Sequence, residues 1–306
     1  MSMPYHLLAR AHAPQWWRPV LGTLVLVVTG AALGLATYLA AGAVAGRPDG
    51  PDGLPSLGEL GDMVLAFVTV AVFLPAAMLA ARWVQRRPAG TLSSVAGRLR
   101  WRWLLTCLPV ALGSITLVLL AGSALTPASA GLVGWRPFAT SMALLVLVVP
   151  VQAAAEEYVC RGWLLQAVGT WVRGPWLPIA VQAVVFAALH GWGTPWGFAD
   201  LLAFGVVAGW LTVRTGGLEA AIALHVANNL LSAGLAAALG ELTVDETAAD
   251  LPWEMVAVDV PQLVAYAAVV LWLARRRGLA PARTAPGAPA PTASGAPVPV
   301  AAGGLG

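Results

Sequence analysis

The 306-residue chain is 59% hydrophobic and only 10% charged, whereas about 25% of the residues of a soluble globular domain are charged. Its formal net charge is +3, and its two cysteines, Cys107 and Cys160, form no paired motif. The sequence therefore supports neither a nucleic-acid-binding surface, nor a disulfide framework, nor a cysteine zinc site. The composition indicates a membrane protein.

Apolar runs long enough, or nearly so, to cross a hydrocarbon core of about 30 Å follow one another along the chain. They predict an all-α, polytopic transmembrane bundle of about eight spans. Two of the runs are short, 198–213 and 260–274, so seven spans is the alternative count. The first run is too long for the apolar core of a signal peptide and is interpreted as a retained span. The runs lie near residues 19–45, 63–84, 103–122, 138–160, 176–192, 198–213, 218–239 and 260–274.

Arginine placement orients the predicted bundle. Arginines crowd the segment 82–102, whereas the segments 46–62 and 240–259 are acidic. Because positively charged loops stay in the cytoplasm, both termini are predicted to be cytoplasmic, with Arg136 as the exception. The alanine- and arginine-rich composition and the short loops are typical of a bacterial plasma membrane protein, and a eukaryotic internal membrane is the alternative.

The end of the chain has a different composition. Residues 278–306 are mainly alanine, proline, glycine and threonine, which cannot bury enough apolar surface to fold. We predict a disordered tail there, after a single transmembrane helical domain over residues 1–277.

Two glutamates follow a long uncharged run in the stretch AAAEEYVCRG, residues 153–162. Ionised carboxylates inside a membrane are costly and usually mark function. Glu157 and Arg161 share one helical face and can pair, whereas Glu156 is rotated about 100° away, so the chemical role falls on Glu156. The alternative is that these residues mark the cytoplasmic interface end of the fourth span, where charges cost little.

Two histidines lie in apolar runs, and each taken alone is typical of a packing residue. Glu156 and His190 are equidistant from residue 173, in the predicted turn 172–176, so a helical hairpin brings them to similar depth. The second helix of that hairpin then ends inside the bilayer. The loop after it must be covered by protein or line a wet cavity, and the hairpin is re-entrant in one interpretation.

His225 lies about 12–14 Å along its helix from the turn 214–217, and Asn229 is one helical turn further on the same face. We therefore predict that Glu156, His190, His225 and Asn229 converge on one polar pocket in the cytoplasmic half of the bilayer. A carboxylate with an imidazole can deprotonate a water, and a second imidazole with a carboxamide can stabilise an oxyanion.

These residues resemble the three motifs of the CPBP family of intramembrane proteases, the CAAX-processing and bacteriocin-processing (Abi) group. The resemblance covers residues 156–229, and the first three spans agree only in being hydrophobic. The matching residues are Glu156, Glu157 and Arg161 for E-E-x-x-x-R, Phe186 and His190 for F-x-x-x-H, and His225 and Asn229 for H-x-x-x-N.

The resemblance implies an intramembrane endopeptidase that cleaves near the cytoplasmic face. In it, Glu156 and His190 activate a water, and His225 and Asn229 stabilise the oxyanion. The implied substrate is a membrane protein or lipidated peptide in the lipid bilayer, and no nucleic acid is expected. The resemblance also gives supporting positions to Phe186 beside His190, and to Arg161 holding Glu157.

Family members are often described as metalloproteases, and Glu156, His190 and His225 form a set that can hold zinc with an open position for water. If Glu156 bound zinc, another group would have to act as base, and Glu157 is predicted to be held by Arg161. We therefore favour a metal-free glutamate mechanism, with zinc as the alternative cofactor.

Two other classes of function compete with the protease. A proton-coupled transporter could use the same ionisable residues, but the sequence lacks a matching pair of interrupted helices in its two halves. A non-catalytic membrane immunity or partner protein could present the basic segment 82–102 to another protein.

Overall fold

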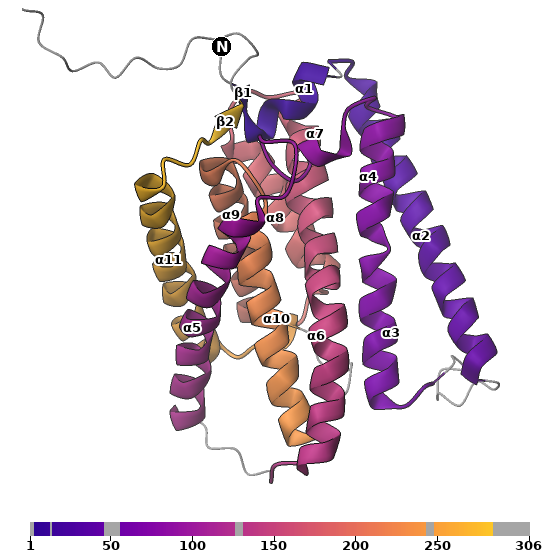
Figure 1. Cartoon of the computed structure of the whole chain (residues 1–306), viewed down its shortest axis with the longest axis vertical. Helices are drawn as coiled ribbons and strands as arrows, with labels where there is room; N and C mark the ends of the chain where they lie inside the picture. The colour runs from indigo at the N-terminus through magenta and orange to yellow at the C-terminus, as the bar shows by residue number, and fades with distance from the viewer. Residues whose placement is uncertain (1–2, 13, 46–55, 126–130, 243–247, 284–306) are drawn as a thin grey trace, which may run out of the picture.

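The computed structural model describes residues 3–12, 14–45, 56–125, 131–242 and 248–283, and this part of the chain is a helical bundle (Figure 1). The predicted all-α architecture is confirmed. The main helices are α2 (Trp17–Ala45), α3 (Glu59–Ala71), α4 (Phe73–Trp83), α5 (Trp101–Leu125), α6 (Trp135–Glu157), α8 (Trp176–Leu189), α9 (Pro195–Thr215), α10 (Glu219–Leu239) and α11 (Trp253–Arg276). The short elements are β1 (Met3–Pro4), η1 (Tyr5–Leu7), α1 (Leu8–His12), η2 (Ala89–Thr91), the π-helical η3 (Tyr158–Leu164), α7 (Leu165–Gly169), η4 (Ala248–Asp250) and β2 (Ala282–Arg283).

Seven helical segments of the described chain are long and apolar enough to cross a membrane, so this is a multi-pass membrane protein. The fifth predicted span, 176–192, is the shorter apolar helix α8, whose 14 residues extend about 21 Å. The two runs predicted to be short are longer than expected. Helix α9 begins at Pro195 behind the N-cap Thr194, and α11 continues past two acidic residues back to Trp253.

The acidic segment predicted over 240–259 is also shorter than expected. Helix α10 ends at Leu239 and α11 begins at Trp253, so Asp259 lies within a helix and not in a loop. A search for uncharged runs stops at each carboxylate, whereas a helix inside a bundle continues wherever that carboxylate faces a polar cavity.

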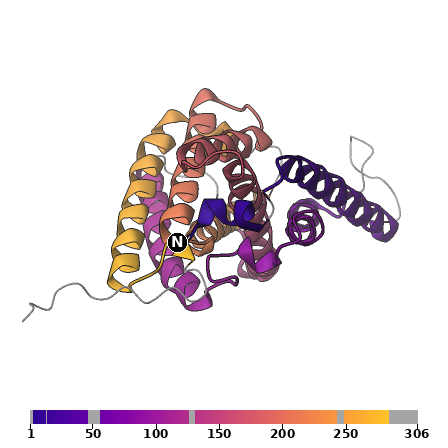
Figure 2. The ribbon, with the colours of Figure 1, turned by 90° about the horizontal axis from the view of Figure 1, so that it is seen from above.

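Helix α10 lies at the centre of the bundle and contacts α5, α6 and α9 (Figure 1). Its first turns bury a series of alanines, which allow neighbouring helices to approach closely as in other membrane bundles. Leucines on the outer faces, such as Leu147 at 69% exposure, point away from the core, as expected for side chains that contact lipid. Seen from above, α2 lies at one side, next to the segment formed by α3 and α4 (Figure 2).

The two ends of the described chain meet on one side of the bundle. Strand β1 pairs antiparallel with β2, with Met3 opposite Arg283. This pairing places both ends of the described chain at the same face of the bundle. It also extends the described structure to Arg283, within the segment predicted as tail, and residues 284–306 lie outside the described residues.

The arginine-rich segment between α4 and α5 folds back onto that same face. Arg87 is buried and donates hydrogen bonds to Thr91 and Gln166, each at 2.7 Å. Arg100 forms an ion pair with Glu219 at the start of α10, with an N–O distance of 2.6 Å. Two arginines of this basic segment therefore serve the fold itself.

Candidate active site

The two glutamates lie where a long helix changes its geometry. Helix α6 ends at Glu157, the π-helical η3 follows directly, and α7 continues the same span. Such π-helical insertions concentrate at functional sites, because the extra residue rotates side chains out of α-helical register. In this protein the π-helical segment lies between the two glutamates at the end of α6 and the last helical turns, which end at Gly169.

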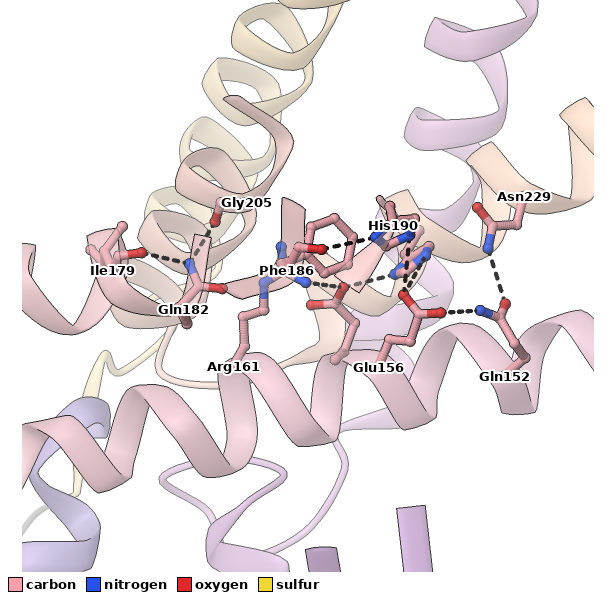
Figure 3. A network of polar contacts seen from close by, with 11 residues as sticks. Gln152, Glu156, Arg161, Ile179, Gln182, Phe186, His190, Gly205 and Asn229 are labelled. Carbon is pink, nitrogen blue, oxygen red and sulfur yellow. Dashed lines mark hydrogen bonds and ion pairs between the residues drawn. The ribbon is translucent and has the colours of Figure 1, made fainter. Parts of the chain in front are cut away.

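Glu156 presents one free carboxylate oxygen to two imidazoles (Figure 3). Its Oε1 atom accepts a hydrogen bond from Gln152 Nε2. Its Oε2 atom is buried, has no hydrogen-bond partner, and lies 3.8 Å from His190 Nε2 and 3.7 Å from His225 Nε2. The predicted convergence of Glu156 with both histidines is therefore present. A gap of this width is one that a single bridging water spans.

The other nitrogen of each histidine fixes its tautomer. His190 Nδ1 lies 2.9 Å from the carbonyl oxygen of Phe186. His225 Nδ1 lies 2.8 Å from Glu157 Oε1. A carbonyl and a carboxylate can only accept hydrogen bonds, so the proton of each imidazole is assigned to Nδ1. In the neutral form of each ring, the Nε2 lone pair points toward Glu156.

Glu157 is the centre of a second, fully buried group. Its Oε1 accepts from Arg161 Nη1 at 2.8 Å, the ion pair that the sequence predicts, and also from His225 Nδ1. The link to His225 is not evident from helical spacing. It connects two helices far apart in the sequence, and it means that Glu157 orients an imidazole as well as an arginine.

Phe186 packs against both Arg161 and His190. The guanidinium carbon of Arg161 lies 4.2 Å from the centre of the Phe186 ring, and the ring centres of Phe186 and His190 are 4.6 Å apart. Phe204 packs beside Phe186 with its ring centre 5.5 Å away. Phe186 therefore lies beside His190, as the family motif implies, and it stacks with Arg161 on a buried cation–π contact.

Gln152 and Asn229 complete the polar network. Asn229 Nδ2 donates to Gln152 Oε1 at 3.0 Å, and Gln152 in turn donates to Glu156 (Figure 3). The sequence argument includes Asn229 but misses Gln152. The sequence feature that could have pointed to Gln152 is its position as a single amide in an apolar run, one helical turn before Glu156.

The loop after α8 is held at its far end by the segment around η4, while Gly191, Trp192 and Gly193 are exposed. Gly191 and Gly193 have positive φ values of 94° and 33°, which reverse the chain toward α9. Thr194 N donates to the carbonyl of Ala249 at 2.8 Å, and Thr194 Oγ1 donates to that of Leu251 at 2.7 Å. The segment around η4 thus satisfies irregular backbone at membrane depth.

One cavity of about 500 Å³ is lined by Gln152, Glu156, His190, His225 and Asn229. Its apolar walls come mainly from α3 and α5, including Phe67 and Ile115. Two further carboxylates, Asp200 on α9 and Asp259 on α11, line the same cavity and were not among the predicted site residues. The volume lies within the usual range of ligand pockets.

The candidate ligand atoms around Glu156 lie further apart than the ligands of a tetrahedral zinc ion. Ligand atoms around a tetrahedral zinc with bonds of about 2.0–2.1 Å lie about 3.3 Å apart. The separations of 3.7 Å and 3.8 Å between Glu156 and the histidines are wider. Within the described residues, no group of three or more His, Cys, Asp or Glu side chains is placed to hold a metal ion.

The fold and site define a polytopic membrane protein whose buried carboxylate faces two imidazoles. The family model described as type II CAAX prenyl endopeptidase Rce1-like matches residues 138–231. This range contains every residue of the three motifs, and the match confirms the resemblance to the CAAX protease family.

Among curated proteins, the chain is similar to the uncharacterized protein YyaK of Bacillus subtilis (strain 168). The two are 28% identical over 177 residues, which are 55% of this chain and 59% of YyaK. The chain therefore aligns with less than two thirds of that relative. No solved structure matches the chain.

Proposed function

We propose that this protein is an intramembrane endopeptidase of the CAAX-protease type, with Glu156 as the base that activates water. The observation that supports it is the position of Glu156 Oε2, which is buried, without a hydrogen-bond partner, and less than 4 Å from the Nε2 atoms of His190 and His225. The Rce1-like match over this region supports the peptidase class.

In the proposed reaction a water lies between Glu156 Oε2 and His190 Nε2. The carboxylate accepts one proton from it as the oxygen attacks the peptide carbonyl carbon. The carbonyl oxygen gains the electron pair of the C=O π bond and becomes the oxyanion. When that oxyanion collapses, the C–N bond breaks and the proton held by Glu156 passes to the leaving amine.

Asn229 and His225 are the proposed oxyanion donors. The second Nδ2 proton of Asn229 remains for the substrate, since the first is donated to Gln152. His225 carries a proton on Nδ1, so it donates from Nε2 only as the imidazolium. The buried carboxylate of Glu157 at 2.8 Å stabilises that cation.

The mechanism as proposed uses only this chain's own side chains. Gln152 holds one oxygen of Glu156 and leaves the other toward the histidines, while Glu157 and the Phe186 carbonyl fix the tautomers. Zinc remains the competing cofactor, and metal content is measured directly in the experiment below.

The proposed setting is the plasma membrane of a bacterium, with both termini in the cytoplasm. The arginines of the segment 82–102 and the run Arg275–Arg277 lie at the end of the bundle where the two strands pair. The cavity lies deeper, among apolar helices, so the proposed substrate is a membrane protein or lipidated peptide that reaches it from the bilayer.

The test uses the detergent-purified full chain and a quenched-fluorescence peptide library. Wild type is compared with Glu156→Gln and with Glu254→Gln, a matched change at an exposed position on α11. We expect Glu156→Gln alone to lose cleavage. Equal cleavage by all three proteins would remove the proposal, and unchanged cellular behaviour on replacing both His190 and His225 would favour a non-catalytic partner.

Metal dependence is tested in the same samples. Metal content is determined by mass spectrometry for wild type and for a His190→Ala, His225→Ala double variant. Cleavage that resists chelators and is lost in the double variant supports the glutamate mechanism. Stoichiometric zinc that disappears together with cleavage in the double variant would replace it with a zinc hydrolase.

A further inference from the structure

Two carboxyl groups outside the family motifs lie in the same cavity as Glu156. Asp200 is in the second turn of α9 and Asp259 is in α11. The two carboxyl groups are close enough to interact electrostatically. Two carboxylates this close repel each other, so the pair favours either a shared proton or a bound cation.

Burial of this pair needs an explanation, because carboxylates in a membrane are retained for function. Asp200 is 5% exposed, and its Oδ1 atom is buried without a hydrogen-bond partner. Among the described residues that line the cavity there is no arginine, and the only basic side chains are His190 and His225. The described walls of the cavity therefore provide no arginine that could pair with Asp200 and Asp259.

The catalytic mechanism proposed above does not use this pair. Glu156 is held by Gln152 and faces two histidines, and no hydrogen bond or ion pair of the described residues joins that network to Asp200. What the pair adds to the cavity is negative charge at a fixed place.

The depth of the pair follows from helix geometry. At 1.5 Å per residue, Asp200 lies about 24 Å from the turn between α9 and α10, whereas His225 lies about 11 Å from that turn. The pair is thus about 13 Å further from the arginine-rich end. An extended peptide covers that distance in about three to four residues.

We propose that Asp200 and Asp259 form a subsite for a cationic group of the substrate, a lysine or arginine side chain about three to four residues from the cleaved bond. This inference rests on the proposed peptidase function and names the substrate class of that same cavity. An ammonium or guanidinium between two carboxylates makes charge-assisted hydrogen bonds. It would satisfy Asp200 Oδ1 and take the place of the shared proton.

The test uses quenched peptides that are identical except for lysine or norleucine at one position, scanned from two to five residues on each side of the cut bond. Wild type is expected to cleave the lysine peptide with at least a tenfold higher kcat/KM at one such position. The variants Asp200→Asn, Asp259→Asn and the double variant are expected to lose this preference and keep cleavage of the norleucine peptide. Glu254→Gln on α11 is the matched control, and it is expected to keep the preference.

Three results would overturn the subsite. They are equal kcat/KM for the two peptides in wild type, a lysine preference that survives in the double variant, and a stoichiometric inorganic cation lost in the double variant instead of the preference. Asp259→Asn alone serves if the Asp200 variants do not fold, since Asp259 is only half-buried.

A binding measurement separates failure of the subsite from failure of the peptidase proposal. Fluorescence anisotropy of the labelled lysine and norleucine peptides is measured with the full chain carrying Glu156→Gln, with and without the two Asn substitutions. Tighter binding of the lysine peptide that depends on the two aspartates supports the subsite even if no peptide is cleaved. Equal binding of the two peptides refutes it, whether or not wild type is a peptidase.

Discussion

His225 Nδ1 lies 2.8 Å from the carboxylate of Glu157, and this contact fixes the imidazole so that its Nε2 points at Glu156. The two consecutive glutamates therefore act on opposite nitrogens of one ring. Glu156 faces the cavity, and Glu157 lies behind it with Arg161. This division of roles links the helix geometry at η3 to the chemistry proposed for the site.

Replacing Gln152 with leucine tests whether the amide positions Glu156. Without its hydrogen bonds to Glu156 and Asn229, the carboxylate is free to rotate away from the histidines. Misplacement of a catalytic group by about 1 Å costs up to about 100-fold, so we expect kcat to fall by about 10- to 100-fold with little change in KM.

Gln262→Leu is the control for this prediction. Gln262 is a buried amide on α11 that donates to Ser114 and does not line the cavity. An equal fall in kcat for the two variants would show that Gln152 acts through general stability and not through Glu156.

Replacing Arg161 with alanine tests the buried ion pair. Both side chains of the Glu157–Arg161 pair are fully buried, so removal of Arg161 leaves an uncompensated carboxylate. We expect the free energy of unfolding to fall by about 3–5 kcal/mol. A Glu157→Gln, Arg161→Met double variant is expected to recover much of that stability without recovering activity, because His225 loses its carboxylate.

Thermal denaturation in detergent checks this prediction, with Arg173→Ala as an exposed control. If Arg161→Ala melts within about one degree of the Arg173 variant, the pair does not contribute as described.

Parts of the site followed from the sequence because helix spacing alone determines them. The Glu157–Arg161 pair needs only one helical turn, and the depth match of Glu156 with His190 needs only the hairpin about residue 173. Gln152 and Asp200 did not follow, because the rotation of each helix about its axis is set by packing between helices. Asp259 was missed for a related reason, since acidic residues near the end of a span resemble a loop.

The contact between η4 and the first turn of α9 is tight, and adding one methyl group tests it. A Cβ at Gly197 would lie 2.1 Å from the carbonyl oxygen of Ala249, whereas a Cβ at Gly174 would meet nothing within 4 Å. We expect Gly197→Ala to destabilise the protein by about 1–3 kcal/mol and to lower activity, because the shift of η4 releases the loop next to His190. The two variants are compared by thermal denaturation and by cleavage. If Gly197→Ala matches Gly174→Ala in both, the contact between η4 and α9 is not as tight as described.

His6 gives the folded protein a pH dependence outside the membrane spans. Burial lowers the pKa of His6 below its usual 6.5, and the ring lies 2.9 Å from the carbonyl of Arg173. The unfolded chain therefore binds a proton near pH 6.5 that the folded protein binds only at lower pH. Stability is retained above pH 6.5 and falls as the pH drops below it.

Melting temperatures at pH 7.5 and pH 5.5 check this, for wild type and for His6→Gln. The drop between the two pH values is expected to be smaller in the variant. An equal drop in both proteins would mean that other groups carry the pH dependence.

Cleavage by the Glu156→Gln variant tests the central claim most directly. The substitution keeps the size of the side chain and removes the base, so we expect the rate to fall by about 10²–10⁴-fold, with a melting temperature close to that of wild type and Glu254→Gln fully active. Cleavage by Glu156→Gln within about twofold of wild type would contradict the assignment of Glu156 as the base.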